Sequence, residues 1–467
     1  MAHPYRKFTL LLIALNICIF SLAKGQDSAP LLTDESKEKI VNKISQLLKE
    51  NYVFKDVGQA CANFLSEQIE NDAYEDISHP RAFARELTSD LGNIHQDQHI
   101  RIQSIAPADQ RLKPNQRLDF FLRTRDRIKD NMGIKKINIL SSNVGYIDIR
   151  YFEPFELARE KVLHMLHLIQ DTDAIIIDLR NNLGGNPTMV QFLCSYFFDQ
   201  PVHLNSIYWR RGDYTEEFWT MDSIGIEKRP EVPVFVLTGS RTFSGGEEFA
   251  YNIKTQKRGT VVGETTAGGA NPGYTFRINE NFNIFIPTGR SINPVTETNW
   301  EGKGVEPDIK IKSSDALSFA LEKAEHAARI YREKTDDQAV VFYLRLCAEF
   351  DRMDTLIVQN NLDSARSVIH NTLLKAVHEN LINEWMINDL GYRYLSKNQF
   401  DAALILFQFN VEYYPESFNV YDSLGEVYMK SGQTKLAIEN YNKSLKINPR
   451  NENAKYMLSK LSQSKNK

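Results

Sequence analysis

Two loops of this chain combine glycines with a side chain that could do chemistry. In the first, the apolar run at 174–179 is followed, after a few mostly polar residues, by the pair Gly184 and Gly185. In the second, the apolar run at 234–237 is followed by a loop that ends in Ser244 and Gly245, just before a helical pattern. Backbone N–H groups in such turns point toward negative charge, and a serine oxygen at a helix start is stabilised as it becomes an anion.

Each loop also has a purely structural interpretation. The first could be a tight turn between a strand and a helix, and Ser244 followed by Glu247 is a capping box. In an open parallel sheet, however, loops at the carboxyl ends of strands face one crevice. There, one loop would supply a serine and the other a glycine N–H for an oxyanion hole, which makes acyl transfer the natural reaction class.

The elements around these loops indicate an α/β architecture. From residue 137 onward, short apolar runs occur, and two of them are followed by helical patterns, which predicts a mainly parallel sheet with crossover helices. The expected strands lie at 144–149, 174–179, 234–237, 261–262 and 284–286, and the block closes near residues 308–311. We therefore assign residues 137–312 to an α/β core.

The N-terminal third divides into three segments. Residues 1–25 have a short basic start, an apolar run and small residues, which predicts a signal peptide cleaved before Gln26, with an uncleaved anchor as the alternative. Residues 26–105 keep helical spacing and predict a helical domain. The polar, basic stretch 106–136 is interpreted as a connector with strand content.

An internal repeat occupies the C-terminal part. The pattern of Leu390, Gly391 and Ala403 recurs 34 residues later, and the clearest repeats span 386–449. This pattern resembles tetratricopeptide repeats, in which small residues let paired helices approach closely. We expect a linker helix over 313–337 and helical repeats over 338–467.

Composition narrows the classes of function. The 467 residues carry a net charge of −4, so no basic surplus favours nucleic acid, and no apolar stretch after the signal is long enough for a membrane span. The length favours two to three domains. No nucleotide-binding or metal-binding motif occurs, so we expect neither cofactor nor metal.

Four motifs in order resemble the superfamily of C-terminal-processing, or tail-specific, serine peptidases. They read DLRNNLGG, TFSGGEEFAY, GTVVGETTAGG and EGKGVEPDI, and the resemblance covers about residues 30–312. It implies an α/β (α+β) core of the ClpP/crotonase-like type, with Ser244 as the nucleophile. It also implies an oxyanion hole made by Gly184 or Gly185 with the amide of Gly245.

The sequence also indicates a branch of this superfamily. The tail-specific branch uses a lysine general base at the position of Gly269 and inserts a PDZ domain, for which 106–136 is too short. The other branch resembles the tricorn protease core and the interphotoreceptor retinoid-binding protein. Its histidine base falls on His99, and its acidic partner falls on Glu301.

Alternatives remain at three positions. His95 competes with His99, and Glu306 competes with Glu301. Gln98 stands where tricorn-type enzymes have a serine before the histidine, so Gln98 is a candidate fourth member of the site. Histidine suits proton abstraction near neutral pH, and a carboxylate can orient it.

These features lead to one main hypothesis and two alternatives. The main hypothesis is an exported serine endopeptidase, periplasmic or extracellular, whose repeats recruit a polypeptide substrate or partner. The first alternative is an inactive binding protein for an apolar ligand or peptide on the same fold. The second is an assembly scaffold in which the repeats dominate.

Overall fold

The computed structural model describes residues 31–105 and 116–464, so the expected signal peptide lies outside the described residues. The chain divides into two compact units, and the division along the sequence falls between Tyr331 and Arg332. No helix in the described part is long and apolar enough to cross a membrane.

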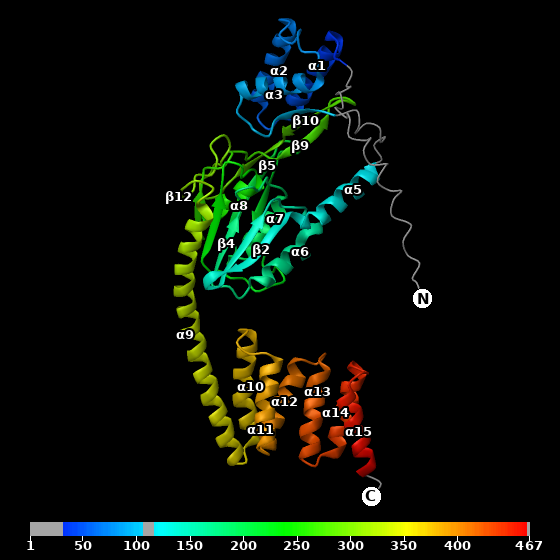
Figure 1. Ribbon diagram of the computed structural model, residues 1–467, viewed down its shortest axis with the longest axis vertical. Helices are drawn as coiled ribbons and strands as arrows, with labels where there is room; N and C mark the ends of the chain where they lie inside the picture. Colours follow the sequence, from blue (N-terminus) through cyan, green and yellow to red (C-terminus); the bar gives the residue numbers. More distant parts are fainter. Residues whose placement is uncertain (1–30, 106–115, 465–467) are drawn as a thin grey trace, which may run out of the picture. The chain divides into compact units, whose positions relative to one another are not determined.

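Three helices form the N-terminal part, as the spacing of apolar residues predicts (Figure 1). They are α1 (Asp34–Asn51), α2 (Lys55–Glu70) and α3 (Pro80–Ile94). The backbone N–H of Ser36 donates to the Thr33 hydroxyl at the start of α1, and Pro80 opens α3. The predicted helical domain is therefore present.

A six-stranded sheet forms the centre of the first unit, in the order β12-β8-β7-β4-β3-β2. Its first five strands are parallel, and only β2 at the edge is antiparallel. The strands are β2 (Ile134–Leu140), β3 (Val144–Ile149), β4 (Ala174–Asp178), β7 (Val234–Thr238), β8 (Thr260–Gly263) and β12 (Ile309–Lys310). The mainly parallel sheet is as predicted.

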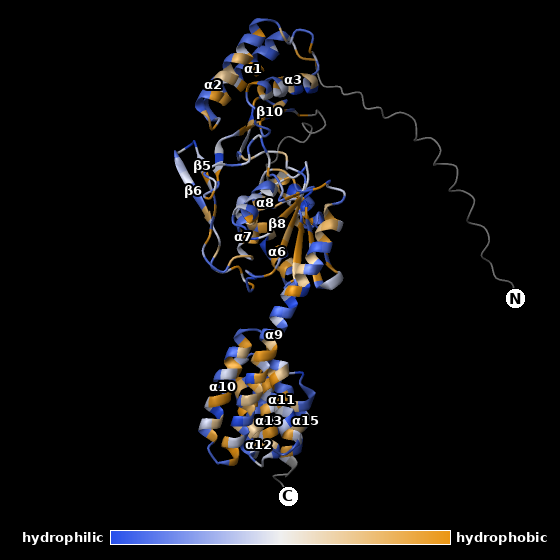
Figure 2. Ribbon diagram, turned by 90° about the vertical axis from the view of Figure 1, so that its left-hand side faces the viewer, coloured by the Kyte–Doolittle hydropathy of each residue, from blue (hydrophilic) through white to orange (hydrophobic). Residues whose placement is uncertain are grey.

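Helices bury both faces of this sheet, which is why its central strands are hydrophobic throughout (Figure 2). On one face pack α6 (Phe155–Leu168), α7 (Pro187–Ser195) and α8 (Gly245–Thr255). On the other face packs the start of α9 (Ala316–Val358), through a row of buried alanines. Because β4 and β7 are parallel neighbours, the loops that follow them leave the same edge of the sheet.

Two small antiparallel sheets complete the first unit. One has the order β1-β10-β9, with β1 (Arg101–Ser104), β10 (Phe282–Pro287) and β9 (Gly273–Arg277). The other has the order β11-β5-β6, with β11 (Gly289–Ile292), β5 (His203–Trp209) and β6 (Tyr214–Trp219). The strand expected at 284–286 therefore exists, but it pairs with β1 and packs against α1–α3 rather than joining the parallel sheet.

The connector differs from the expectation. Its described part holds a helix, α5 (Gln116–Lys129), and β2 begins at Ile134. Arginine, leucine and lysine favour helices because they lose little side-chain freedom there. The expected strand content of the described connector is therefore limited to residues 134–136, the start of β2.

The second unit is a stack of helices. It contains the end of α9, then α10 (Leu362–His378), α11 (Glu384–Ser396), α12 (Phe400–Tyr413), α13 (Phe418–Lys430), α14 (Thr434–Ile447) and α15 (Glu452–Ser464). A Cβ on Gly391 would lie 2.5 Å from the Phe407 ring, and one on Gly425 would lie 3.0 Å from the Tyr441 ring. The repeated glycines thus permit the close helix contacts that the repeat pattern predicts.

Candidate active site

The first glycine loop leads from β4 into α7. Asn186 caps the helix by accepting a hydrogen bond of 3.0 Å from the Met189 N–H, and Pro187 follows as the first helical residue. Gly184 and Gly185 have φ of +95° and +137°, where a side chain is strained. A Cβ on Gly185 would also lie 2.0 Å from the Phe152 carbonyl oxygen, so this turn requires glycine.

The second loop holds Ser244 in a strained backbone conformation. Ser244 lies between β7 and α8 with φ 51° and ψ −121°, a region that non-glycine residues rarely occupy. Sharp strand-to-helix turns of this kind expose a serine oxygen above a sheet in other hydrolases. The sequence predicted the helix start, but only the structure shows the strain.

The two loops touch at Ser244. A Cβ on Gly184 would lie 2.6 Å from the Ser244 Cβ and 2.9 Å from the Gly245 nitrogen. The Phe243 N–H donates to the Asn182 carbonyl oxygen at 2.9 Å, which ties one loop to the other. The structure therefore brings the predicted serine and the predicted glycines together.

The backbone amides of this junction are not equivalent. The Gly184 N–H donates to Asn182 Oδ1 at 2.7 Å. Within the described residues, the N–H groups of Gly185 and Gly245 donate no hydrogen bond. These two amides are consequently the ones free to bind an oxyanion beside Ser244.

Glu247 holds the serine turn in place. Its Oε2 accepts hydrogen bonds from the Ser244 N–H at 2.9 Å and the Gly269 N–H at 2.8 Å. Its Oε1 accepts from the Thr266 hydroxyl at 2.5 Å and the Gly268 N–H at 2.6 Å. Burial raises the pKa of Glu247 to about 7, even though these four donors oppose the rise.

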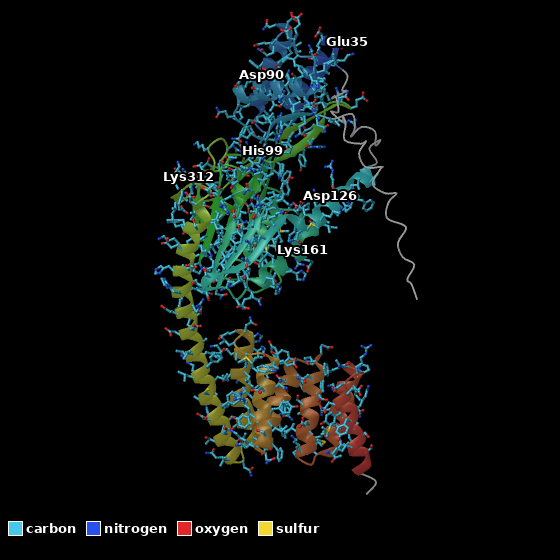
Figure 3. The ribbon with its side chains drawn as sticks, viewed as in Figure 1. Glu35, Asp90, His99, Asp126, Lys161 and Lys312 are labelled. Atoms are coloured by element: carbon cyan, nitrogen blue, oxygen red, sulfur yellow. The ribbon has the colours of Figure 1, made fainter. Side chains whose placement is uncertain are left out.

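His99 follows α3 and lies against the serine loop. Its ring centroid is 4.5 Å from that of Phe243, the residue before Ser244, and 5.8 Å from that of Phe285. Figure 3 labels His99 near the junction of α1–α3 with the strands. Burial lowers the pKa of His99, which keeps the imidazole neutral and able to accept a proton near neutral pH.

Two carboxylates lie beside His99. The Nδ1 of His99 is 3.9 Å from Asp97 Oδ1. A ring nitrogen of His99 and one carboxylate oxygen each from Asp97 and Glu301 lie within 4.8 Å of one another. Glu301 Oε2 accepts from the N–H groups of Ala270 and Asn271 at 2.6 and 3.1 Å, while its Oε1 has no partner among the described residues. Burial and the Asp97 charge both raise the pKa of Glu301.

Asp97, His99 and Glu301 are also residue types that bind zinc. Among the described residues, their clustered side chains are the ones that could hold a metal ion. Asp97 and Glu301 can also act without a metal, by stabilising the His99 imidazole once it is protonated. A buried imidazole that takes up a proton needs a nearby negative charge.

The alternatives from the sequence lie elsewhere. His95 contacts the rings of Tyr52 and Phe54, and Glu306 is exposed, with its carbonyl oxygen accepting from Lys254 Nζ. Gln98 Nε2 donates to the Ala267 carbonyl oxygen at 2.5 Å, so its side chain fastens the histidine segment to the 266–269 loop. Of these, only Gln98 lies at the site.

Sequence reasoning missed Asp97, and it took Glu247 only for a helix cap. Asp97 Oδ1 accepts from the His99 N–H, and Asp97 Oδ2 accepts from the Tyr52 hydroxyl and Asn271 Nδ2. The only local signal was an acid two residues before His99. The partners come from distant segments, which the sequence alone does not connect.

Comparisons with known proteins agree with this geometry. Residues 143–311 match peptidase family S41, and residues 31–131 match the N-terminal domain of Peptidase_S41 in eukaryotic IRBP. Residues 143–311 are a peptidase family S41 domain. Residues 418–451 match the tetratricopeptide repeat. The resemblances seen in the sequence are thus confirmed.

Named relatives are processing proteases. The chain is 25% identical over 218 residues to carboxy-terminal processing protease CtpB of Bacillus subtilis, covering 46% of this chain and 44% of that protein. It is 25% identical over 181 residues to the chloroplastic carboxyl-terminal-processing peptidase 1 of Arabidopsis thaliana, covering 38% and 35%. The chain therefore spans less than half the length of these relatives.

The solved structures to which this chain is similar include the crystal structure of the tricorn protease. The TM-score is 0.39 at 13% sequence identity, and the likeness covers 63% of this chain and 37% of the tricorn chain.

Proposed function

We propose that this protein is an exported serine endopeptidase that cleaves polypeptides with Ser244 as the nucleophile and His99 as the general base. The observation that carries this is the Ser244 turn, where a strained serine adjoins two unbonded amides. The S41 domain and the processing-protease relatives support the same reaction.

The geometry suggests a role for each group. Ser244 Oγ attacks the carbonyl carbon of the scissile bond, and His99 takes the hydroxyl proton. The oxyanion that forms accepts hydrogen bonds from the N–H groups of Gly185 and Gly245. Protonated His99 then donates to the leaving amine, and water hydrolyses the acyl-enzyme by the same steps.

Glu301 is the proposed partner of protonated His99. Its unpartnered Oε1 belongs to the same cluster as the imidazole, and the two backbone bonds to Oε2 fix its orientation. A carboxylate in this place holds the ring and stabilises the imidazolium that forms during the reaction.

Export and partner recruitment complete the proposal. The basic start and apolar run within residues 1–25 support export to the periplasm or the cell exterior. The stack α10–α15 supports a role of the repeats in recruiting a polypeptide substrate or partner, since stacked helix pairs offer a concave surface.

The deciding experiment is labelling with a fluorophosphonate probe, which reacts with activated serines. The wild-type protein should be labelled and should hydrolyse an unfolded polypeptide, whereas Ser244→Ala should do neither. Ser240→Ala, in the same loop, is the control and should label normally. Equal labelling of wild type and Ser244→Ala would contradict the assignment, and saturable binding without hydrolysis would indicate a binding protein instead.

A further inference from the structure

A hollow of about 210 Å³ lies directly beside His99. Phe243 and His99 form the side nearest the candidate nucleophile. The opposite side comes from the small sheet β1-β10-β9, and it includes Arg101 and Asn283. A side chain of a polypeptide positioned for cleavage at Ser244 would therefore enter a space that contains a guanidinium.

The register of the sheet explains why Arg101 faces this hollow. Arg101 lies opposite Phe285, and Gln103 lies opposite Asn283, so these side chains share one face of the sheet. Ile102, between them, is buried on the other face, among the residues of α1–α3. Arg101 is the first residue of β1 and follows His99 by two residues.

A second, shallower hollow of about 610 Å³ continues along β1. Arg101 lines both hollows, and α3 adds Arg81 and Arg85 to the second one. Among the residues that the structure describes, no aspartate or glutamate lines either hollow. The path that leads away from His99 is therefore cationic, although the whole chain has a net charge of −4.

The side chains of two of these arginines are available to bind an anion. Among the described residues, the side chains of Arg85 and Arg101 make no hydrogen bond and no ion pair, and both residues are exposed. Guanidinium groups bind carboxylates through paired N–H donors, which makes arginine better suited than lysine to this contact.

The outer edge of β1 limits how a polypeptide could bind here. The Ile102 N–H, which points away from β10, donates to the Thr88 hydroxyl at 3.0 Å. Because α3 already covers this edge, addition of a substrate strand to β1 is blocked. Side-chain charge remains as the means of recognition.

We propose that Arg101, assisted by Arg85, selects polypeptides that carry acidic side chains next to the scissile bond. This inference rests on the proposed peptidase function and names the substrate class of the same site. Since both arginines are exposed, salt screens the attraction, and the preference should shrink as ionic strength rises.

The test uses the full-length protein and two series of fluorogenic peptides that differ only in Asp and Glu against Asn and Gln on either side of the scissile bond. Wild type should show a kcat/KM roughly tenfold higher for the acidic series, mainly through KM. Arg101→Glu should remove this preference and favour peptides with lysine in the same positions. Arg101→Gln should remove the preference without reversing it.

Lys161→Glu is the matched control. Lys161 is an exposed residue of α6 (Figure 3) that lines neither hollow, and the substitution changes the net charge by the same amount. It should leave the preference unchanged. Equal kcat/KM for the two series, or the same effect from Lys161→Glu and Arg101→Glu, would overturn the inference.

A separate measurement distinguishes this inference from the peptidase proposal. Fluorescence anisotropy of a labelled acidic peptide with the Ser244→Ala protein reports binding without turnover. If wild type cleaves no peptide but Ser244→Ala binds the acidic peptide more tightly than its amide counterpart, the peptidase proposal fails and the recognition stands. If cleavage occurs without preference for acidic peptides, only the recognition fails.

Discussion

His99 occupies the space that a side chain at residue 269 would need. A Cβ added to Gly269 would lie 2.8 Å from His99 Cε1 and 2.2 Å from the Phe243 ring. A lysine at this position would therefore require both Phe243 and His99 to shift. The glycine at 269 and the position of His99 belong to one packing arrangement.

Gly269→Ala should destabilise the protein and abolish activity. The added methyl group must displace Phe243 or His99, and overpacking of this kind typically costs about 1–3 kcal/mol. Gly92→Ala is the control, because a Cβ there meets nothing within 4 Å and alanine favours the α3 helix. Thermal unfolding and peptide hydrolysis check both, and an active, stable Gly269→Ala protein would contradict the packing argument.

Peptidase activity should persist to lower pH than an ordinary histidine allows. Burial lowers the pKa of His99, so the neutral base survives below the usual midpoint of about 6.5. In a plot of kcat/KM against pH, the midpoint of the acidic limb should therefore lie below that value. Because the unfolded chain binds this proton more readily, the contribution of His99 to stability is lost as the pH falls. An acidic limb above about 6.5 would contradict this prediction.

Glu301→Gln should separate activity from stability. We expect kcat to fall by about 10² or more, because the imidazolium loses its proposed partner. Stability should be retained, because the amide oxygen can still accept the two backbone N–H groups. The pKa of Glu301 is higher in the folded protein, so its favourable contribution is lost as the pH rises. The variant should thus gain relative stability with increasing pH in denaturant titrations.

Asp97→Asn provides the contrast within the same cluster. Asp97 Oδ2 accepts from Tyr52 and Asn271, and Oδ1 accepts from the His99 N–H, so an amide nitrogen at either position would leave a donor without an acceptor. We expect a loss of about 1–3 kcal/mol in unfolding free energy as well as lower activity. Equal stability of the Asp97→Asn and Glu301→Gln proteins would show that these bonds contribute nothing to the folded state.

Glu247→Gln and Glu248→Gln form a matched pair on α8. Glu247 accepts four hydrogen bonds, whereas Glu248 accepts one, from Asn205 at 3.3 Å, and burial raises its pKa to about 8. We expect Glu247→Gln to lose fluorophosphonate labelling and about 2 kcal/mol or more of stability, because an amide cannot accept all four bonds. Glu248→Gln should change both by much less.

Removal of residues 332–467 should leave hydrolysis of a short unstructured peptide within about twofold of wild type. Each unit has its own hydrophobic clusters, and every candidate catalytic residue lies before Tyr331. Cleavage of a natural protein substrate should fall, if the repeats recruit it. Loss of both activities in a folded truncated protein would assign the repeats to the catalytic unit.

The sequence by itself determined the features that depend on local pattern. Buried parallel strands occur as short apolar runs, the repeats as a period of 34 residues, and the serine loop as a glycine-flanked helix start. From these, together with the family motifs, came the sheet, the helical parts and the choice of Ser244, His99, Glu301 and the glycines. Such features arise from residues close together in the chain, which is why the order of amino acids is enough to predict them.

Tertiary structure decided what depends on contacts between distant segments. It shows that the Gly184 N–H is already bonded, which leaves Gly185 and Gly245 free. It places β10 beside β1, brings Glu301 to Asp97 and His99, and brings Phe243 and Arg101 to one hollow beside the base. No local pattern carries these relationships, because each one arises only when loops far apart in the sequence pack around one serine.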